Sequence, residues 1–127
     1  MKELRIAVLP GDGIGPDVTA QAVRVLQAAA ERFGLRLALS HYPVGAAAVA
    51  SAGGPLPAET RAAVVNADAV LLGAVGDPSL DHAPRHLRPE TGLLALRALL
   101  GVYANLRPPV SSSPNTWPTW TCSSCVS

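Results

Sequence analysis

The 127-residue sequence has few charged, aromatic and sulfur-containing side chains. Charged residues make up 15%, and the formal net charge of +1 shows no excess that would favour nucleic acid or an anionic membrane as a partner. Aromatic residues make up only 4%, so a core must be built from small aliphatic side chains. Two cysteines, Cys122 and Cys125, are too few for a closed structural zinc site, which normally takes four ligands.

Long uninterrupted hydrophobic runs are also missing. The stretch 37–58 has no formal charge, but prolines, glycines and His41 interrupt it, so it does not predict a membrane span. The N-terminal sequence MKELRIAVLPGDG has too short an apolar run before its Pro-Gly turn to be a signal peptide. We therefore expect a soluble cytoplasmic protein of one domain's length.

Segments with strand-like and helix-like apolar patterns alternate along the chain. The nearly continuous apolar run at 4–9 is typical of a strand buried on both faces. Pro16 fits the first position of a helix, and Gly34 fits the residue after its end. Strands are expected at 4–9, 35–39, 69–73 and 102–106, and helices at 16–33, 57–67 and 90–100. This order predicts an α/β fold with a mostly parallel sheet flanked by helices.

The last expected helix places three side chains of different chemistry on one face. Glu90, Leu93 and Arg97 are three and four residues apart, a spacing that makes neighbours on a helix. Arg107 follows on the next extended segment and can converge on them. Two guanidinium groups suit bidentate capture of carboxylates, and a leucine between them suits an alkyl branch, so a small branched organic acid is a candidate ligand. Alternatively, the charged residues form a solvated face and the leucines belong to the core.

Two other motifs each carry a feature that argues against a ligand. The sequence GDGIGP at 11–16 follows a strand and opens a helix, where anions often bind. However, Pro16 replaces the third glycine of the dinucleotide fingerprint and Asp12 would repel a phosphate, so a tight structural turn is the better interpretation. His82 and His86 are four apart, but Pro84 argues against the regular helix that a metal-binding pair would need.

Four blocks of the sequence resemble one family of dehydrogenases. They are RPETGLLALR with YANLRP, IAVLPGDGIGPDV, the helix-like stretch beginning at Pro57, and AVLLGAVG. Together they resemble the β-decarboxylating dehydrogenases, and among these the 3-isopropylmalate dehydrogenases. The resemblance covers residues 5–108. It implies that residues 1–108 form the N-terminal part of an incomplete domain of this family, which is not a Rossmann fold.

The resemblance implies NAD as the cofactor and two segments that face it. The GDGIGP turn would lie beside the nicotinamide end, with Ile14 packed near it. The loop after the third expected strand would face the cofactor through Asp77 and Pro78, and Glu90 would lie between nicotinamide and substrate. The chain departs from the usual pattern at Asp77, where a glycine is commoner.

The resemblance also implies 3-isopropylmalate as the substrate. Arg97 and Arg107 would bind the malate carboxylates, and Leu93 would contact the isopropyl branch. The reaction is oxidation by NAD and loss of the β-carboxylate to give 4-methyl-2-oxopentanoate in leucine biosynthesis, with Mg²⁺ or Mn²⁺ polarising the hydroxyl. Leu93 and Leu94 favour isopropylmalate over isocitrate, whose extra carboxylate calls for a polar group. The alternatives are a relative that uses tartrate, homoisocitrate or isocitrate, and a non-catalytic α/β binding module.

The family's catalytic tyrosine and lysine and its metal-binding aspartates would lie beyond residue 127. The resemblance therefore implies no catalytic residue and no metal ligand in this chain. We expect the chain by itself to have no turnover. The family is homodimeric, and this chain is not expected to dimerise in the native way.

The residues after Arg107 differ in character, because they carry no charged side chain but hold both tryptophans and both cysteines. A disordered tail is one interpretation, and a Cys122–Cys125 redox pair lacks the strand-to-helix setting that it needs. Shifted by one base, a possible codon string for 113–127 reads FPEHLAHLDLLIVRE, which resembles the family's continuation. We hypothesise that 109–127 is a non-family, out-of-frame product, which the nucleotide sequence of the preceding codons would test.

Overall fold

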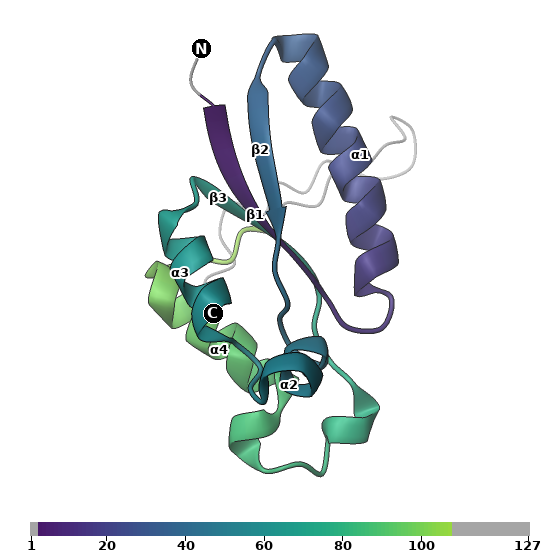
Figure 1. The fold of residues 1–127 in the computed structure, drawn as a ribbon, viewed down its shortest axis with the longest axis vertical. Helices are drawn as coiled ribbons and strands as arrows, with labels where there is room; N and C mark the ends of the chain where they lie inside the picture. Colours follow the sequence, from purple (N-terminus) through teal and green to yellow (C-terminus); the bar gives the residue numbers. More distant parts are fainter. Residues whose placement is uncertain (1–2, 108–127) are drawn as a thin grey trace, which may run out of the picture.

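The computed structural model describes residues 3–107, which form alternating strands and helices (Figure 1). The elements are β1 (Glu3–Gly11), α1 (Gly15–Phe33), β2 (Arg36–His41), α2 (Ala46–Ala52), α3 (Ala58–Asn66), β3 (Ala69–Ala74) and α4 (Pro89–Leu100). Two short 3₁₀ turns, η1 (Pro78–Leu80) and η2 (Arg85–Leu87), lie between β3 and α4. The expected α/β fold is confirmed.

The described strands form one parallel sheet in the order β2-β1-β3. Val8 of β1 is opposite His41 of β2, and Leu9 is opposite Leu72 of β3. Both Val8 and Leu9 are fully buried. Because neighbouring side chains of a strand point to opposite faces, β1 is covered on both sides, as its apolar run predicts.

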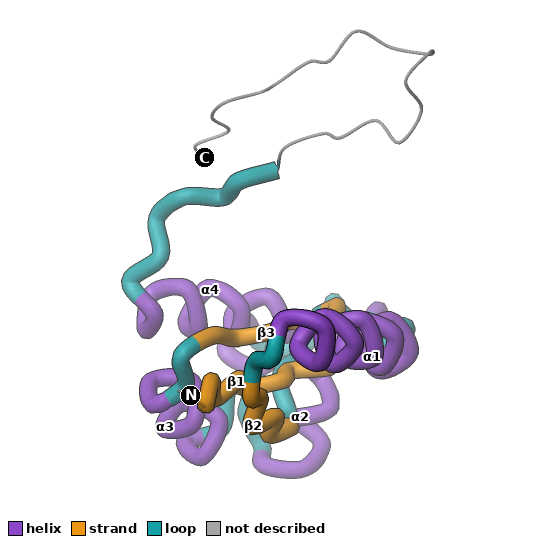
Figure 2. The backbone as a smooth tube through the Cα atoms, turned by 90° about the horizontal axis from the view of Figure 1, so that it is seen from above, coloured by secondary structure: helices purple, strands orange, loops and turns teal. Residues whose placement is uncertain are grey.

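Helices cover the two faces of the sheet (Figures 1 and 2). Helix α1 packs on one face, and α3 and α4 lie together on the other. The side chains that fill the space between the sheet and α3 and α4 form one core cluster, made of Ala7, Leu9, Val44, Leu56, Val64 and Leu96. All of these are aliphatic, in keeping with the scarcity of aromatic residues.

Helix α1 begins and ends where the sequence predicts. Pro16 is in the first turn, and Asp17 places a carboxylate at the positive end of the helix. Gly34 follows the last turn with a φ of 65°, a left-handed conformation that glycine adopts without a steric penalty. The N–H of Leu35 then donates to the carbonyl of Ala30 and closes the helix end.

Two expectations about secondary structure were wrong or incomplete. The strand expected at 102–106 is absent, and these residues form no regular element. Tyr103 there is 89% exposed. A strand needs a paired neighbour, and this segment leads away from the sheet (Figure 2). Helix α2 was not expected, because its sequence AAAVASA carries no capping or periodic signal of its own.

The segment 109–127 lies outside the described residues, so the out-of-frame hypothesis and the cysteine pair stay predictions. Among the described helices, none combines the length and the apolar character that a bilayer crossing would require.

Candidate functional site

The turn at 11–15 lies against the end of β3. It is at the side of the sheet where the carboxyl ends of the three parallel strands lie. The N–H of Asp12 donates to the carbonyl oxygen of Ala74 over 2.7 Å. A β-carbon on Gly11 would overlap this same oxygen, and one on Gly15 would overlap the carbonyl oxygen of Pro10. Glycine is therefore required at both positions for close backbone approach, which agrees with the interpretation of the motif as a tight structural turn.

Asp12 faces inward from this turn and is only 6% exposed. Its Oδ2 accepts hydrogen bonds from the N–H of Ala46 at 2.9 Å and of Gly76 at 3.1 Å, and its Oδ1 accepts one from Ala47 at 2.9 Å. The carboxylate thus satisfies two N–H groups at the start of α2 and one in the loop after β3.

Sequence reasoning missed this role of Asp12. A short polar acceptor in a glycine-rich turn is typical of local backbone hydrogen bonding. However, Ala46 is 34 residues and Gly76 is 64 residues from Asp12 in the sequence, and no spacing rule identifies such partners.

The loop after β3 contains Gly76, whose φ of 145° favours glycine. Asp77 then caps η1, because its Oδ1 accepts a hydrogen bond from the N–H of Ser79 at 2.8 Å. Hydrogen bonding from Ser79, through its side chain and its backbone, lowers the pKa of Asp77 below its ordinary value of 3.8. Asp77 is therefore a charged capping residue here, next to Pro78.

The carboxylate of Glu90 reaches this loop. A β-carbon built on Gly76 would stand 4.0 Å from Oε1 of Glu90. Ile14 belongs to the turn that Asp12 ties to Gly76, and its side chain is 63% exposed. The fold therefore assembles three of the expected cofactor-facing segments at one edge: the turn with Ile14, the loop with Asp77 and Pro78, and the start of α4.

The expected face of α4 is present. Glu90 and Arg97 are exposed and Leu93 is partly buried, whereas Leu96, one turn after Leu93 on its buried side, is 3% exposed and belongs to the core. Glu90, Leu93 and Arg97 thus share a surface open to solvent. The alternative interpretation, that the leucines of this helix belong to the core, is therefore correct for Leu96.

Arg107 is not brought onto this surface. It follows the irregular segment after α4, which leads away from the sheet and helices (Figure 2). Its side chain is exposed, and its Nε donates to Oδ1 of Asn105 at 3.3 Å. The convergence expected from the sequence depended on a strand at 102–106, which these residues do not form.

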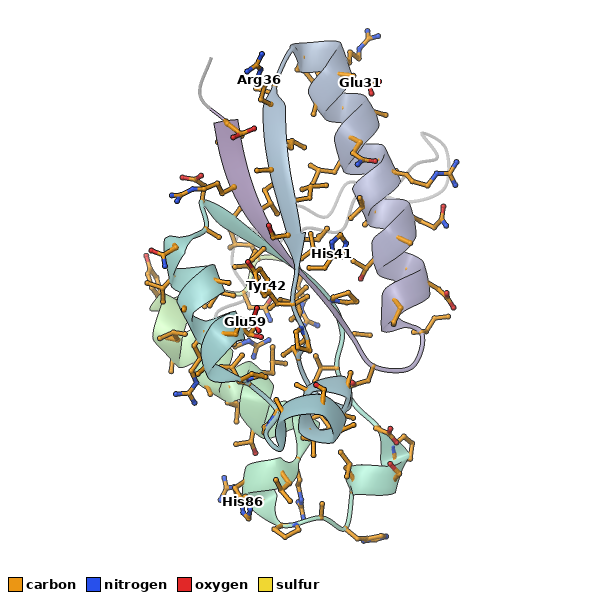
Figure 3. All side chains as sticks on the ribbon, in the orientation of Figure 1. Glu31, Arg36, His41, Tyr42, Glu59 and His86 are labelled. Carbon is orange, nitrogen blue, oxygen red and sulfur yellow. The ribbon has the colours of Figure 1, made fainter. Side chains whose placement is uncertain are left out.

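The segment between Asp81 and α4 is held by backbone acceptors. Nε of Arg88 donates to the carbonyl of Ala83 at 3.0 Å, and the Thr91 hydroxyl donates to the carbonyl of Arg85 at 2.6 Å. His86 lies at the outer end of the molecule, away from the sheet (Figure 3). Among residues 3–107, no three His, Cys, Asp or Glu side chains are grouped to hold a metal ion.

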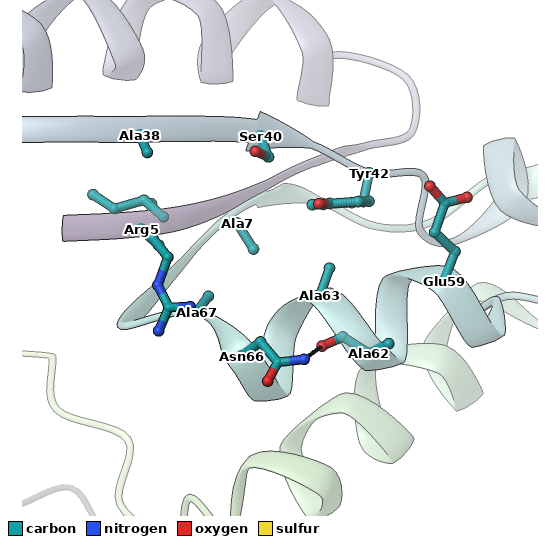
Figure 4. Close-up of a pocket in the computed structure, with 11 residues that line it drawn as sticks. Arg5, Ala7, Ala38, Ser40, Tyr42, Glu59, Ala62, Ala63, Asn66 and Ala67 are labelled. Atoms are coloured by element: carbon teal, nitrogen blue, oxygen red, sulfur yellow. Dashed lines mark hydrogen bonds between the residues drawn. The ribbon is translucent and has the colours of Figure 1, made fainter. Parts of the chain in front are cut away.

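A hollow of about 460 Å³ lies between the sheet and α3. Short side chains such as Ala7, Ala38 and Ala63 line it, with Arg5 at one end and Tyr42 towards the other (Figure 4). The hollow exists because methyl groups cannot fill the distance between the strands and the helix. None of the residues expected to bind cofactor or substrate lines it, so it is separate from the candidate site.

The sequence is similar to that of known dehydrogenases. The family described as isocitrate/isopropylmalate dehydrogenase matches residues 5–120. A 3-isopropylmalate dehydrogenase of Thermosynechococcus vestitus is 59% identical over 104 residues, which are 82% of this chain and 29% of that protein. One from Geobacillus kaustophilus is 56% identical over 110 residues, which are 87% of this chain and 30% of the relative. The chain therefore spans about 30% of the length of these relatives.

Solved structures show the same fold. A β-decarboxylating dehydrogenase of Thermococcus kodakarensis matches with a TM-score of 0.67 and 38% identity, over 84% of this chain and 30% of that one. An isocitrate dehydrogenase of Methylococcus capsulatus matches with a TM-score of 0.63 and 30% identity, over 80% of this chain and 27% of that one. From the family match and these likenesses, the chain belongs to the isocitrate/isopropylmalate dehydrogenase family.

Proposed function

We propose that this chain is the N-terminal part of an enzyme that oxidises and decarboxylates 3-isopropylmalate with NAD, giving 4-methyl-2-oxopentanoate in leucine biosynthesis. The observation that carries the proposal is the face of α4 that Glu90, Leu93 and Arg97 share, with the Glu90 carboxylate next to Gly76. The relatives named 3-isopropylmalate dehydrogenase support this substrate over the others used in the family.

Arg97 and Leu93 divide the recognition of the substrate between them in this proposal. The Arg97 guanidinium binds a malate carboxylate, and such a charge-assisted contact contributes about 1.5–3 kcal/mol. Leu93 packs against the isopropyl branch. Arg107 supplies the second guanidinium, which requires the segment after α4 to turn back towards α4 in the longer protein.

The residues at the sheet edge fit the nicotinamide end of NAD. Ile14 offers an exposed aliphatic side chain on which a flat ring can pack. Gly76, which has no side chain, leaves space directly beside the Glu90 carboxylate. Asp77 and Pro78 continue this surface, and Glu90 orients the ring and the substrate towards each other. NAD supplies the hydride acceptor for the oxidation.

Divalent Mg²⁺ or Mn²⁺, proposed for the longer enzyme, would polarise the substrate hydroxyl. We propose, from the family resemblance, that its aspartate ligands follow residue 127. The longer enzyme is proposed to be a cytoplasmic homodimer. The residues described here bind and orient substrate and cofactor, and they do not transfer the proton.

The proposal is tested with a completed enzyme, in which residues 1–107 replace the matching N-terminal part of the Geobacillus kaustophilus 3-isopropylmalate dehydrogenase, 56% identical over 110 residues. We expect NADH formation with 3-isopropylmalate and Mg²⁺, at a kcat/KM well above that for isocitrate, tartrate or homoisocitrate. A higher kcat/KM for any of these three would reassign the substrate. Absence of turnover with all four, in a protein that melts cooperatively, would remove the proposal.

The 127-residue chain alone should form no NADH catalytically under the same conditions. It provides a negative control, because it carries the binding face of α4 but spans about 30% of the relatives' length. A steady rate of NADH formation by the purified chain would show that this expectation is wrong.

A further inference from the structure

A single carboxylate joins the segments that carry the proposed cofactor site. The Asp12 carboxylate accepts hydrogen bonds from three backbone N–H groups in two segments distant in sequence, the start of α2 and the loop after β3. The turn around it is held as well, because its own N–H donates to Ala74 and its carbonyl accepts from Gly15 at 2.8 Å. Backbone and side chain of one residue therefore lock the turn to the loop after β3.

The hydrogen bonds of Asp12 lie between residues that are expected to face NAD. Ile14 is two positions after Asp12, and Asp77 and Pro78 directly follow Gly76, whose N–H the carboxylate holds at 3.1 Å. On its other side, Gly76 lies next to Oε1 of Glu90. The backbone bond from Asp12 to Ala74 and the side-chain bond from Gly76 to Asp12 thus both tie the turn that carries Ile14 to the loop that the Glu90 carboxylate reaches.

The Asp12 carboxylate is buried and closely surrounded. Asp12 is 6% exposed, and Gly45 lies so close to it that a β-carbon at residue 45 would overlap Oδ2. In this space both carboxylate oxygens are held by N–H donors. Loss of the carboxylate would leave amide groups without partners, so the loop would move or take up water.

We propose that Asp12 is a positioning residue for cofactor binding, which sets the distance between the Ile14 turn and the Gly76–Pro78 loop without itself contacting NAD. The inference rests on the proposed function, which assigns these two segments to NAD. It adds a role to a residue whose charge, judged from the sequence, opposes an anionic ligand at this turn.

Asp12→Ala in the completed enzyme tests the inference. We expect the KM for NAD to rise about tenfold or more, the amount expected when a hydrogen bond to a charged group is lost. The KM for 3-isopropylmalate, which is set by Arg97 and Leu93, should change much less. Thr60→Val is the matched control, because it removes a buried hydrogen bond from the Thr60 hydroxyl to the carbonyl of Pro43 without touching the turn or the loop.

Asp12→Asn provides a second test of the inference if the Asp12→Ala variant does not fold. With its amide oxygen in the place of Oδ2, asparagine retains the bonds to Ala46 and Gly76 and loses the one to Ala47. Amide exchange of Gly76 in the completed enzyme reports whether this happens. We expect the KM for NAD to follow Gly76 protection: near the unsubstituted value if the amide is protected, and raised if it exchanges freely.

The outcomes separate the two proposals. An unsubstituted completed enzyme that does not use NAD would remove the proposed function and this inference with it. If the unsubstituted enzyme is active, two results would overturn the inference alone. One is an Asp12→Ala enzyme that folds with an unchanged KM for NAD, and the other is an Asp12→Asn enzyme whose Gly76 exchanges freely at an unchanged KM. An equal rise of the KM for NAD in Thr60→Val would also overturn it, because the effect would then be general loss of stability.

Discussion

Gly92 of α4 lies directly against Pro55: a β-carbon at residue 92 would stand 2.8 Å from the Pro55 carbonyl oxygen and 2.9 Å from its Cβ. Gly92 is buried, and this contact determines which side of α4 faces the protein. Glu90 and Arg97, on the opposite side, are therefore turned outward, and Leu93 lies between the two sides and is partly buried.

Gly92→Ala should push α4 away from Pro55 and destabilise the chain. Overpacking against backbone atoms costs about 1–3 kcal/mol, whereas the higher helix propensity of alanine returns about 1 kcal/mol. We expect a net loss of about 1 kcal/mol, and at most about 2 kcal/mol, in the free energy of unfolding, measured by urea denaturation. Gly54→Ala is the control, because a β-carbon there meets nothing within 4 Å. Equal stability of the two variants would contradict the contact.

Arg97→Ala in the completed enzyme should lower kcat/KM for 3-isopropylmalate about tenfold or more, because one charge-assisted contact to a carboxylate is lost. Arg97→Lys should recover only part of it, since an ammonium group cannot make the bidentate contact. Arg24→Ala is the control, as Arg24 is an exposed arginine on α1 whose guanidinium donates a hydrogen bond to Gln21. Steady-state kinetics that do not distinguish Arg97→Ala from this control would refute the assignment.

Arg107→Ala should have an effect of similar size, about tenfold or more, in the completed enzyme if the segment after α4 turns back to the substrate. In the 127-residue chain, Arg107 bonds to Asn105 and is exposed, so the same change should leave the melting temperature unaltered. The contrast between the two proteins is the measurement. Normal kinetics of the completed Arg107→Ala enzyme would leave Arg97 as the only guanidinium of the site among those proposed.

Leu93→Ala should weaken recognition of the alkyl branch specifically. Removing most of an aliphatic side chain from a contact costs about 1–2 kcal/mol, so the kcat/KM for 3-isopropylmalate should fall about tenfold. The kcat/KM for malate, which lacks the branch, should change little. Leu94→Ala, at a position 60% exposed, tests whether the neighbouring leucine contributes. Equal losses for both substrates after Leu93→Ala would argue against a branch pocket at Leu93.

The Asp77 cap should depend on pH. Its carboxyl has a pKa below the ordinary 3.8, so its contribution to the η1 turn is present above that value and is lost as the pH falls through the lower folded pKa. An NMR titration of the Asp77 carboxyl carbon measures this pKa. Ser79→Ala should raise it towards 3.8, and Ser51→Ala, in α2, should not. An unchanged titration in Ser79→Ala would show that Ser79 is not the cause.

Sequence alone predicted the elements whose causes are local. The apolar period of α1 with Pro16 and Gly34 at its ends, and the buried run of β1, depend on neighbours within a few residues. The shared face of Glu90, Leu93 and Arg97 follows from helix geometry once α4 is recognised, because residues three and four apart are always adjacent on a helix. These features appear in the structure as expected.

The tertiary structure decided what depends on distant partners. Helix α2 has no capping residue of its own. Its first N–H, that of Ala46, is capped by the carboxylate of Asp12, which lies 34 residues earlier in the sequence. The residues 102–106 have a strand-like composition, but strand formation needs a paired neighbour, and they have none among the described residues. Asp12 itself looked like a group that repels anions until the fold turned it inward onto three N–H groups. Hydrogen bonds between remote backbone segments leave no periodic trace in a sequence, so only the folded chain reveals them.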